Sequence, residues 1–293
     1  MKKIDLHCHV IAFPQYSPTL SNGEKLLSAE EQIAIHEKMG VHMGVLLPLV
    51  SPEARRSVVN NEETQYIVAQ YPDKFTWFCN VDPRQGKDRA ELANIMGQYK
   101  EKGAKGIGEI TATLYADDPM MQNLFCACVE LDMPALFHIS PRPGASYGII
   151  DDLGLPRIEK MLKKYPDLKL IGHSQAFWSE ISSDVVEETR KHCPKTKVSE
   201  GRVPKLMREY GNLYCDLSAG SGHNAMMRDP EYAAKFLTEF SDRVFYGSDV
   251  CYASQTFQYD FVNFLESLYK EGGISLDTYE KICYKNAEKL LKL

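Results

Sequence analysis

The chain has 293 residues, of which 44% are hydrophobic and 25% charged, and its formal net charge is −6. This composition is typical of a globular protein and excludes intrinsic disorder, because hydrophobic residues are frequent and the net charge per residue is small. The negative charge argues against nucleic acid as a partner, since phosphate contacts need a concentrated basic surface.

Short apolar runs alternate along the chain with longer runs of helical spacing, which predicts alternating strands and helices. The predicted strands are residues 4–9, 43–49, 75–81, 104–110, 135–139, 168–173, 212–217 and 243–248. The first helix is predicted from a capping box, in which Ser28 precedes the helix, Glu31 follows three residues later and Gly40 ends it. The later helices are predicted at 60–71, 87–102, 119–131, 155–165, 203–210, 230–240, 254–271 and from Ser275 onward.

Strands with continuous apolar runs that alternate with helices indicate a parallel α/β sheet. Eight such units close most economically into a (β/α)8 TIM barrel, so we predict one domain over residues 1–293, with a doubly wound open sheet as the alternative. Two connections, 140–156 and 174–202, are longer than a barrel needs. Both follow strands and are therefore expected at the C-terminal face, where the substrate loops of such barrels lie.

Polar side chains end several of the predicted strands. His7 and His9 end the first strand, and side chains two residues apart on a strand point to the same side, so these imidazoles supply two ligands of a zinc-type site. Glu109, His138 and His173 lie at the ends of the fourth, fifth and sixth strands, and Asp249 follows the eighth. Because burying such groups without partners is costly, we expect them to converge on a metal at the C-terminal face.

Four sequence motifs carry a resemblance to a known family: Asp-Leu-His-Cys-His at 5–9, Phe-His at 137–138, Ile-Gly-His at 171–173 and Tyr-Gly-Ser-Asp at 246–249. Together they resemble the amidohydrolase superfamily, and more closely its amidohydrolase-related branch, which includes aminocarboxymuconate-semialdehyde decarboxylase. The resemblance covers nearly the whole chain. It implies that His7, His9, His138 and Asp249 bind the metal. It also implies that His173 faces the substrate or the metal-bound water.

Glu109 departs from that branch, which commonly lacks a metal-binding carboxylate on the fourth strand. A glutamate there resembles barrel members with two metals. We therefore expect one ion, with a second if Glu109 bridges, and the alternatives for Glu109 are a substrate contact and a structural salt bridge. Three imidazoles and a carboxylate favour Zn²⁺, with Mn²⁺, Fe²⁺ and Ni²⁺ as alternatives.

Four further residues are predicted to bind the substrate: Arg142, Tyr147, Trp178 and His223. Arg142 follows His138 by four residues, and its guanidinium suits a carboxylate, so we expect a small and anionic substrate. Trp178 is expected to line the pocket, with a place in the core or in an oligomer contact as the alternative. His223 follows the seventh strand in a glycine-containing loop that would pass close to a ligand.

The main functional hypothesis is metal-dependent hydrolysis of a small amide, lactone or ester through a metal-activated water. Asp249 would take the proton of the water, and His173 would stabilise the developing oxyanion. One alternative is non-oxidative decarboxylation of a small carboxylic acid on the same scaffold. Another is a metal-binding barrel without catalysis, which the cost of burying five polar strand ends disfavours.

The sequence also makes predictions about membrane association, cellular location and oligomeric state. The longest apolar run, about 43–50, is far shorter than the roughly 20 residues that span a membrane, so no membrane partner is expected. Asp5, His7 and His9 interrupt any apolar segment after the first lysines, which indicates no export signal and a cytoplasmic location. The eight cysteines are expected to be reduced thiols, and a homodimer is left open beside a monomer.

Overall fold

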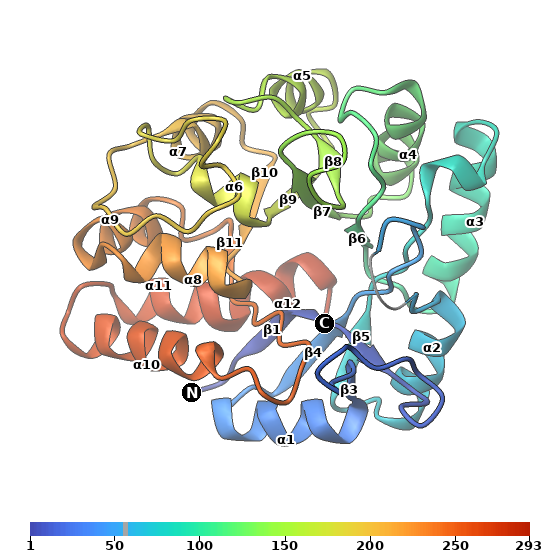
Figure 1. The fold of residues 1–293 in the computed structure, drawn as a ribbon, viewed down its shortest axis with the longest axis horizontal. Coiled ribbons are helices and arrows are strands. Elements are labelled where there is room, and N and C mark those ends of the chain that lie inside the picture. Colours follow the sequence, from blue (N-terminus) through green and yellow to red (C-terminus); the bar gives the residue numbers. More distant parts are fainter. Residues whose placement is uncertain (55–57) are drawn as a thin grey trace.

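The computed structural model describes residues 1–54 and 58–293. Within this part of the chain, parallel strands form a ring in chain order, and the helices lie outside it (Figure 1). The strands of the ring are β1 (Ile4–Cys8), β4 (Met43–Leu46), β5 (Phe75–Trp77), β6 (Ile107–Ile110), β7 (Ala135–Ser140), β9 (Leu170–His173), β10 (Leu213–Asp216) and β11 (Val244–Phe245).

Two seams close the ring between sheets that pair as β1-β4-β5 and β6-β7-β9-β10-β11. A parallel bridge between Cys79 and Ile107 joins the end of β5 to β6. On the other side, the N–H of Leu6 donates to the carbonyl oxygen of Tyr246 at 3.0 Å, which joins β1 to β11. The predicted TIM barrel is therefore confirmed over the open sheet.

The helices of the outer layer begin and end close to the predicted residues. At the first helix, Ser28 accepts the N–H of Glu31, the Glu31 side chain accepts the N–H of Ser28, and Gly40 ends the helix with a φ of 68°. The outer helices are α1 (Ala29–Met39), α2 (Asn61–Gln70), α3 (Arg89–Glu101), α4 (Pro119–Glu130), α5 (Pro156–Lys164), α7 (Arg202–Glu209), α9 (Pro230–Glu239) and α10 (Phe257–Lys270).

The chain after α10 continues as α11 (Leu276–Glu280), a π-helical turn (Lys281–Lys285) and α12 (Asn286–Leu291). Ala287 and Leu291 of α12 pack into an apolar cluster with buried side chains from the strands, among them Ile4, Leu6 and Phe245. This apolar cluster fills the barrel interior beneath the polar residues at the strand ends.

Several short elements within the connections were not predicted. They are β2 (Val10–Ile11), β3 (Leu27–Ser28), β8 (Ile149–Ile150), the 3-10 turn Pro83–Gln85, α6 (Gln175–Ser179) and α8 (Ala219–Met227). The predicted loop after the seventh strand is thus wrong, because helix α8 starts at Ala219. Two glycines lower its helix propensity, and packing against α6, α9 and α10 stabilises it instead.

The last strand is shorter than predicted, and the residues after it make single hydrogen bonds to the π-helical turn and to β1. Tyr246 N–H donates to the carbonyl of Ile282 in the π-helical turn at 2.9 Å. The N–H of Asp249 donates to the carbonyl of His7 at 3.0 Å. These bonds hold the segment that carries Asp249 against the first strand.

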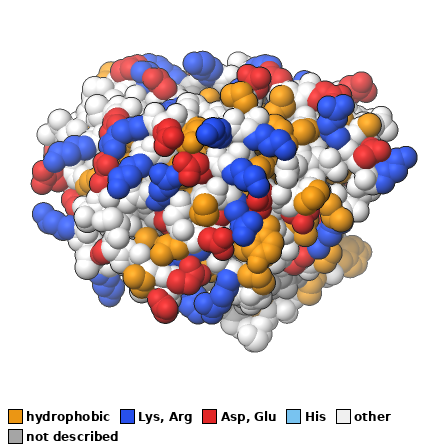
Figure 2. All heavy atoms as spheres, turned by 90° about the horizontal axis from the view of Figure 1, so that it is seen from above, with side chains coloured by type: hydrophobic (Ala, Val, Ile, Leu, Met, Phe, Trp, Pro, Cys, Tyr) orange, Lys and Arg blue, Asp and Glu red, His pale blue; other side chains and the backbone are white. Residues whose placement is uncertain are grey.

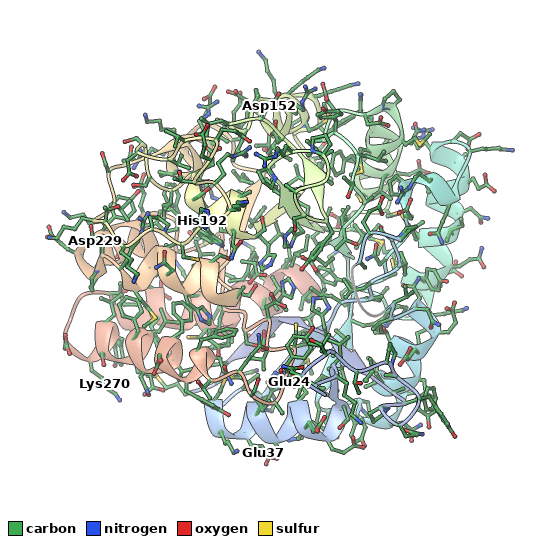
Figure 3. All side chains as sticks on the ribbon, in the orientation of Figure 1. Glu24, Glu37, Asp152, His192, Asp229 and Lys270 are labelled. Atoms are coloured by element: carbon green, nitrogen blue, oxygen red, sulfur yellow. The ribbon has the colours of Figure 1, made fainter. Side chains whose placement is uncertain are left out.

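The outer surface is polar and mixed in charge. Figure 2 shows lysine and arginine side chains interspersed with aspartate and glutamate over one face, without a concentrated basic area there. Glu37, Asp152 and Lys270 are exposed and point away from the barrel (Figure 3). None of the helices within residues 1–54 and 58–293 combines the length and apolar character that crossing a bilayer requires.

Candidate metal centre

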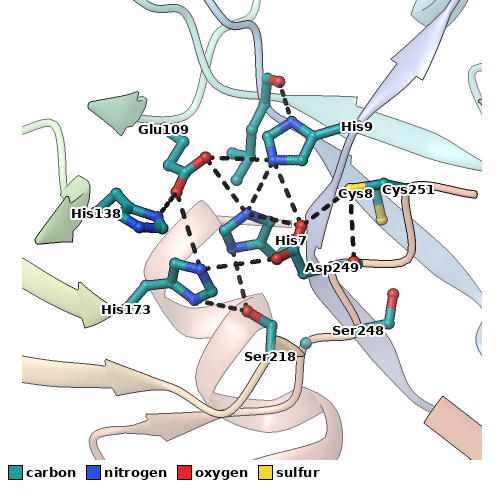
Figure 4. A network of polar contacts seen from close by, with 12 residues as sticks. His7, Cys8, His9, Glu109, His138, His173, Ser218, Ser248, Asp249 and Cys251 are labelled. Carbon is teal, nitrogen blue, oxygen red and sulfur yellow. Dashed lines mark hydrogen bonds and ion pairs between the residues drawn. The ribbon is translucent and has the colours of Figure 1, made fainter. Parts of the chain in front are cut away.

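The end of strand β1 places two imidazoles side by side at the mouth of the barrel (Figure 4), with His7 on the strand and His9 directly after it. The Nε2 atoms of His7 and His9 lie 3.1 Å apart, as their spacing of two residues predicts. Nδ1 of His7 lies 2.6 Å from Oδ2 of Asp216, and Nδ1 of His9 lies 2.9 Å from the carbonyl oxygen of Leu47. Since each Nδ1 donates its hydrogen to an oxygen, each neutral ring presents the lone pair of its Nε2 to the same point.

These facing nitrogens fit a metal ion or a shared proton, because two bare lone pairs at this separation repel each other until a cation joins them. Both rings are buried, so water does not screen the repulsion. Burial alone would lower the pKa of His7, but the carboxylates of Asp249 and Asp216 oppose it and raise this pKa. The surroundings of His7 therefore favour a positive charge at this point.

Two carboxylates face the imidazole pair. Oδ1 of Asp249 lies 3.6 Å from Nε2 of His7 and 3.6 Å from Nε2 of His9. Oε2 of Glu109 lies 3.3 Å from Nε2 of His9 and 3.9 Å from Nε2 of His7. Nitrogen and oxygen ligands at such separations match the donor set that divalent transition metals take in barrel enzymes.

The other oxygen of Glu109 faces two further imidazoles. Oε1 lies 2.8 Å from Nδ1 of His138 and 3.9 Å from Nε2 of His173, which is also 3.8 Å from Oδ2 of Asp249. Burial would raise the pKa of Glu109, but its contacts with His138 and His9 hold it well below its usual range. Two groups of ligand-type side chains therefore adjoin, His7–His9–Asp249 and Glu109–His138–His173, and Glu109 contacts both of them.

Two residues that the sequence analysis did not single out, Asp216 and Ser218, support this cluster from below. Oδ2 of Asp216 lies 2.6 Å from Nδ1 of His7 and 3.4 Å from Nδ1 of His173, while Ser218 Oγ lies 2.9 Å from Nδ1 of His173. Burial would raise the pKa of Asp216, but the imidazoles of His7 and His173 hold it far below its usual range. Asp216 ends the predicted seventh strand, so its position carried the same signal as the other strand ends.

A second buried carboxylate, Asp5, fixes the backbone on both sides of the cluster. Its Oδ1 accepts the N–H of His7 at 3.1 Å and the N–H of Ser248 at 2.8 Å. Its Oδ2 accepts the hydroxyl of Ser248 and lies 3.2 Å from Nε2 of His36 on α1. Asp5 therefore sets the distance between the strand that carries His7 and the segment that carries Asp249.

The loop after β7 carries two of the predicted substrate-binding residues, and the structure places only one of them against the cluster. The ring of Tyr147 lies 4.3 Å from that of His138, centroid to centroid. Burial, with the nearby Glu109 and Asp249 charges, raises the pKa of Tyr147 well above its usual range, so its hydroxyl stays protonated. Arg142 is exposed near the start of the loop.

Tyr147 also lines an open cavity of about 550 Å³. The other residues that line it come from the connections after β4, β6 and β7: Pro52, Glu53, Thr113, Gly144 and Ser146. The Tyr147 ring therefore connects this cavity with His138 of the cluster.

The other two predicted substrate-binding residues lie in the packed interior, which for Trp178 is the alternative stated above and for His223 differs from the expected loop. Trp178 is 2% exposed, packs among Phe177 and Phe236, and donates its Nε1 hydrogen to the carbonyl oxygen of Asp216 at 2.9 Å. His223 is 4% exposed and stacks on Phe261 with ring centroids 4.0 Å apart. Both side chains face the core because α6 and α8 fold back onto the barrel, which periodicity alone does not reveal.

The chain matches known proteins in two ways. The sequence model of a family described as Amidohydrolase matches residues 4–293. No curated protein matches the chain. Among solved structures, an uncharacterised TIM-barrel protein from Bordetella bronchiseptica has 17% identity and a TM-score of 0.67, and the match covers 100% of this chain and 99% of that one.

Two structures with stated activities have the same fold. One is 5-carboxyvanillate decarboxylase from Novosphingobium aromaticivorans, solved with manganese and a nitrobenzoic acid, at 19% identity and a TM-score of 0.63, covering 99% and 96% of the two chains. The other is a probable 2-pyrone-4,6-dicarboxylic acid hydrolase from Acinetobacter baumannii with citric acid bound, at 13% identity and a TM-score of 0.60, covering 100% of both chains. At these identities the likeness shows the fold.

Proposed function

Because the chain belongs to the amidohydrolase family, we propose that it is a metal-dependent hydrolase that acts on a small carboxylated amide, lactone or ester. The observation that carries the proposal is the position of Glu109, whose two oxygens face different groups of ligand-type side chains. A carboxylate in that position suits a bridging ligand of a two-metal hydrolytic site. The facing lone pairs of His7 and His9 support metal binding independently of Glu109.

The proposed ligands are His7, His9 and Asp249 for the principal ion, with Glu109 and His138 offering a second position. The bound metal supplies Lewis acidity and lowers the pKa of water to about 7. Zn²⁺ is our first choice for the nitrogen and oxygen donors, and the manganese in the decarboxylase from Novosphingobium supports Mn²⁺ as the alternative.

The catalytic roles are assigned from the contacts of each side chain. Asp249 is one-fifth exposed, so water can reach it, and we assign it to accept the proton of the attacking water and return it to the leaving group. His173 is buried and is held by Asp216 and Ser218 through Nδ1, which leaves Nε2 directed at the cluster. We assign His173 to stabilise the negative charge that develops on the substrate oxygen.

The substrate is proposed to enter through the cavity beside Tyr147. Its protonated hydroxyl can donate a hydrogen bond to a substrate oxygen, and the exposed Arg142 offers a cation near the start of the same loop. The names of the decarboxylase from Novosphingobium and of the probable hydrolase from Acinetobacter both state a carboxylated ring compound, which supports a carboxylate on the substrate.

Decarboxylation is the second candidate, and the similarity to 5-carboxyvanillate decarboxylase favours it. The same ligands would then hold an oxygen next to the departing carboxylate, while a protonated side chain supplies the hydrogen that replaces it. The hydrolase of similar fold from Acinetobacter favours the first candidate.

One experiment separates the candidates. Protein reconstituted with Zn²⁺ or Mn²⁺ is assayed for ring opening of carboxylated lactones, for hydrolysis of small amides and esters, and for CO₂ release from hydroxybenzoic acids. We expect hydrolysis that chelation abolishes and added metal restores. CO₂ release without hydrolysis would establish the second candidate, and metal binding with neither activity would support a non-catalytic barrel.

The Glu109→Gln variant tests the bridging role in the same assays. An amide is a poor bridging ligand, so elemental analysis should find fewer metal ions per chain and the hydrolytic rate should fall. Full metal content in this variant would remove Glu109 from the ligand set.

A further inference from the structure

The connection between α6 and α7 contains a fully buried guanidinium. Arg190 belongs to a charged stretch of sequence and is 0% exposed. Its Nη1 donates to the carbonyl oxygen of Asp151 at 2.9 Å and to that of Pro141 at 3.2 Å. Its Nε lies 3.2 Å from Oε1 of Glu180, a buried carboxylate at the end of α6. Burying a charge is costly, and the carboxylate of Glu180 and the two carbonyl oxygens offset that cost here, so Arg190 is tied to all three groups.

The two carbonyls that Arg190 binds lie at the two ends of one loop. This loop, residues 141–151, begins directly after β7 and carries Tyr147. Inside the loop, the hydroxyl of Ser140 donates to the carbonyl of Arg142 and accepts the N–H of Ser146. The pairing of β8 with β7 brings Ile150 next to Ser140. Arg190 therefore closes the loop from outside, where the backbone of Pro141 has no strand partner.

The closed loop rests directly on the proposed metal ligand His138. The N–H of Gly148 donates to the carbonyl of Thr111 at 2.8 Å, and a Cβ atom at Gly148 would lie 2.5 Å from the carbonyl oxygen of His138. Tyr147 precedes this contact and packs its ring against that of His138. A shift at either end of the loop would therefore move the Tyr147 ring relative to the cavity.

We propose that Arg190 is a positioning residue, which holds the loop 141–151 closed so that Tyr147 forms the wall between the substrate cavity and His138. The inference deepens the proposed function, since it names a residue that shapes the substrate site of the same centre. Glu180 serves the same arrangement from the other side: its Oε1 accepts the N–H of Gly154 at 2.9 Å and faces the Nε of Arg190.

The test variant is Arg190→Lys, because an ammonium keeps the charge beside Glu180 but its nitrogen ends one bond short of the position of Nη1, the atom that donates to both carbonyls. Arg190→Met with Glu180→Gln is the second variant, which removes both charges so that neither is left unpaired. The control is Arg208→Lys, which alters an exposed arginine paired with Glu200 and Glu239 far from the loop.

Hydrogen–deuterium exchange of the metal-loaded full chain is the first measurement, and it requires no substrate. We expect peptides that cover residues 141–148 to exchange about tenfold faster in Arg190→Lys, while β7, β9 and the melting temperature stay as in the wild type. Unchanged exchange in this loop would overturn the proposal. Faster exchange across the whole barrel would do the same, since it would show a general structural role.

Kinetics supply the second measurement on whichever substrate is active. Arg190→Lys should raise KM more than it lowers kcat, and it should add nothing further in a Tyr147→Ala background, because both act on the same wall. Additive effects of the two substitutions would contradict action through Tyr147. A wild-type protein without activity would reject the proposed function, while the exchange result would still decide the role of Arg190.

Discussion

Replacing Asp216 with asparagine tests the metal centre without replacing any of the proposed ligands. Oδ1 of Asp216 accepts the N–H of Ser218 at 3.0 Å, so the amide oxygen of asparagine takes this position. The amide nitrogen then occupies the position of Oδ2, 2.6 Å from Nδ1 of His7. Because this nitrogen donates a hydrogen, Nδ1 of His7 must accept it and the ring must carry its own hydrogen on Nε2. The lone pair that faces His9 is lost.

Changes of this kind beside a metal-binding histidine cost about 10-fold to 100-fold in metal affinity, or about 1.4–2.7 kcal/mol. We expect the upper half of this range, since Asp216 also contacts Nδ1 of His173. The affinity is measured by competition with a chromophoric chelator, with Zn²⁺ and Mn²⁺ in separate titrations at one pH.

Ser218→Ala is the matched control for this experiment. It removes the hydroxyl that lies 2.9 Å from Nδ1 of His173 and 3.2 Å from Nδ1 of His7 and that donates to Oδ2 of Asp216 at 2.7 Å, but it leaves the carboxylate beside His7 in place. Its metal affinity should therefore stay close to that of the wild type. Equal affinities of the Asp216→Asn and wild-type proteins would refute the assigned tautomer of His7 and, with it, the argument from facing lone pairs.

Three further substitutions test residues that the sequence analysis placed at the substrate. His223 is buried and its pKa is lowered to about 4, mainly by burial, so the unfolded chain takes up its proton first as the pH falls. Between about pH 7 and pH 5 the unfolding free energy of the wild type should therefore fall by about 2 kcal/mol more than that of His223→Phe, as measured by urea denaturation. Equal losses in the two proteins would contradict a buried, neutral His223. Trp178→Phe removes the hydrogen bond to the Asp216 carbonyl and should lower the unfolding free energy by about 1–3 kcal/mol. An unchanged unfolding free energy with weaker substrate binding would show instead that Trp178 contacts the substrate. Arg142→Ala should leave the melting temperature unchanged and raise KM for a carboxylated substrate, and an unchanged KM would exclude Arg142 from substrate binding.

The barrel could be predicted from the sequence because each of its strands and helices is specified by residues close together in the chain. Each buried strand appears as a short apolar run, and each outer helix shows its own spacing and caps, as Ser28 and Glu31 do for α1. The convergence of the ligands was also predictable, since the ends of parallel strands meet at one mouth. Asp216 met the same criterion and could have been included.

Other features depend on packing between distant segments, which a local pattern does not contain. Trp178 and His223 follow strands on the correct face, yet their side chains turn into the core because α6 and α8 pack against the barrel. Arg190 belongs to a charged run that predicts an exposed helix face or loop. Its burial follows from carbonyls and a carboxylate contributed by three separate segments.

Asp5 joins the backbone of His7 to that of Ser248, so the first and last strands of the barrel share one buried carboxylate. This has a consequence for biosynthesis. A chain that is still attached to the ribosome holds His7 and His9 before Asp249, which emerges only after the last strand of the barrel. The complete set of proposed ligands therefore cannot form until that strand has been made, and metal uptake is expected to follow closure of the barrel rather than to start it.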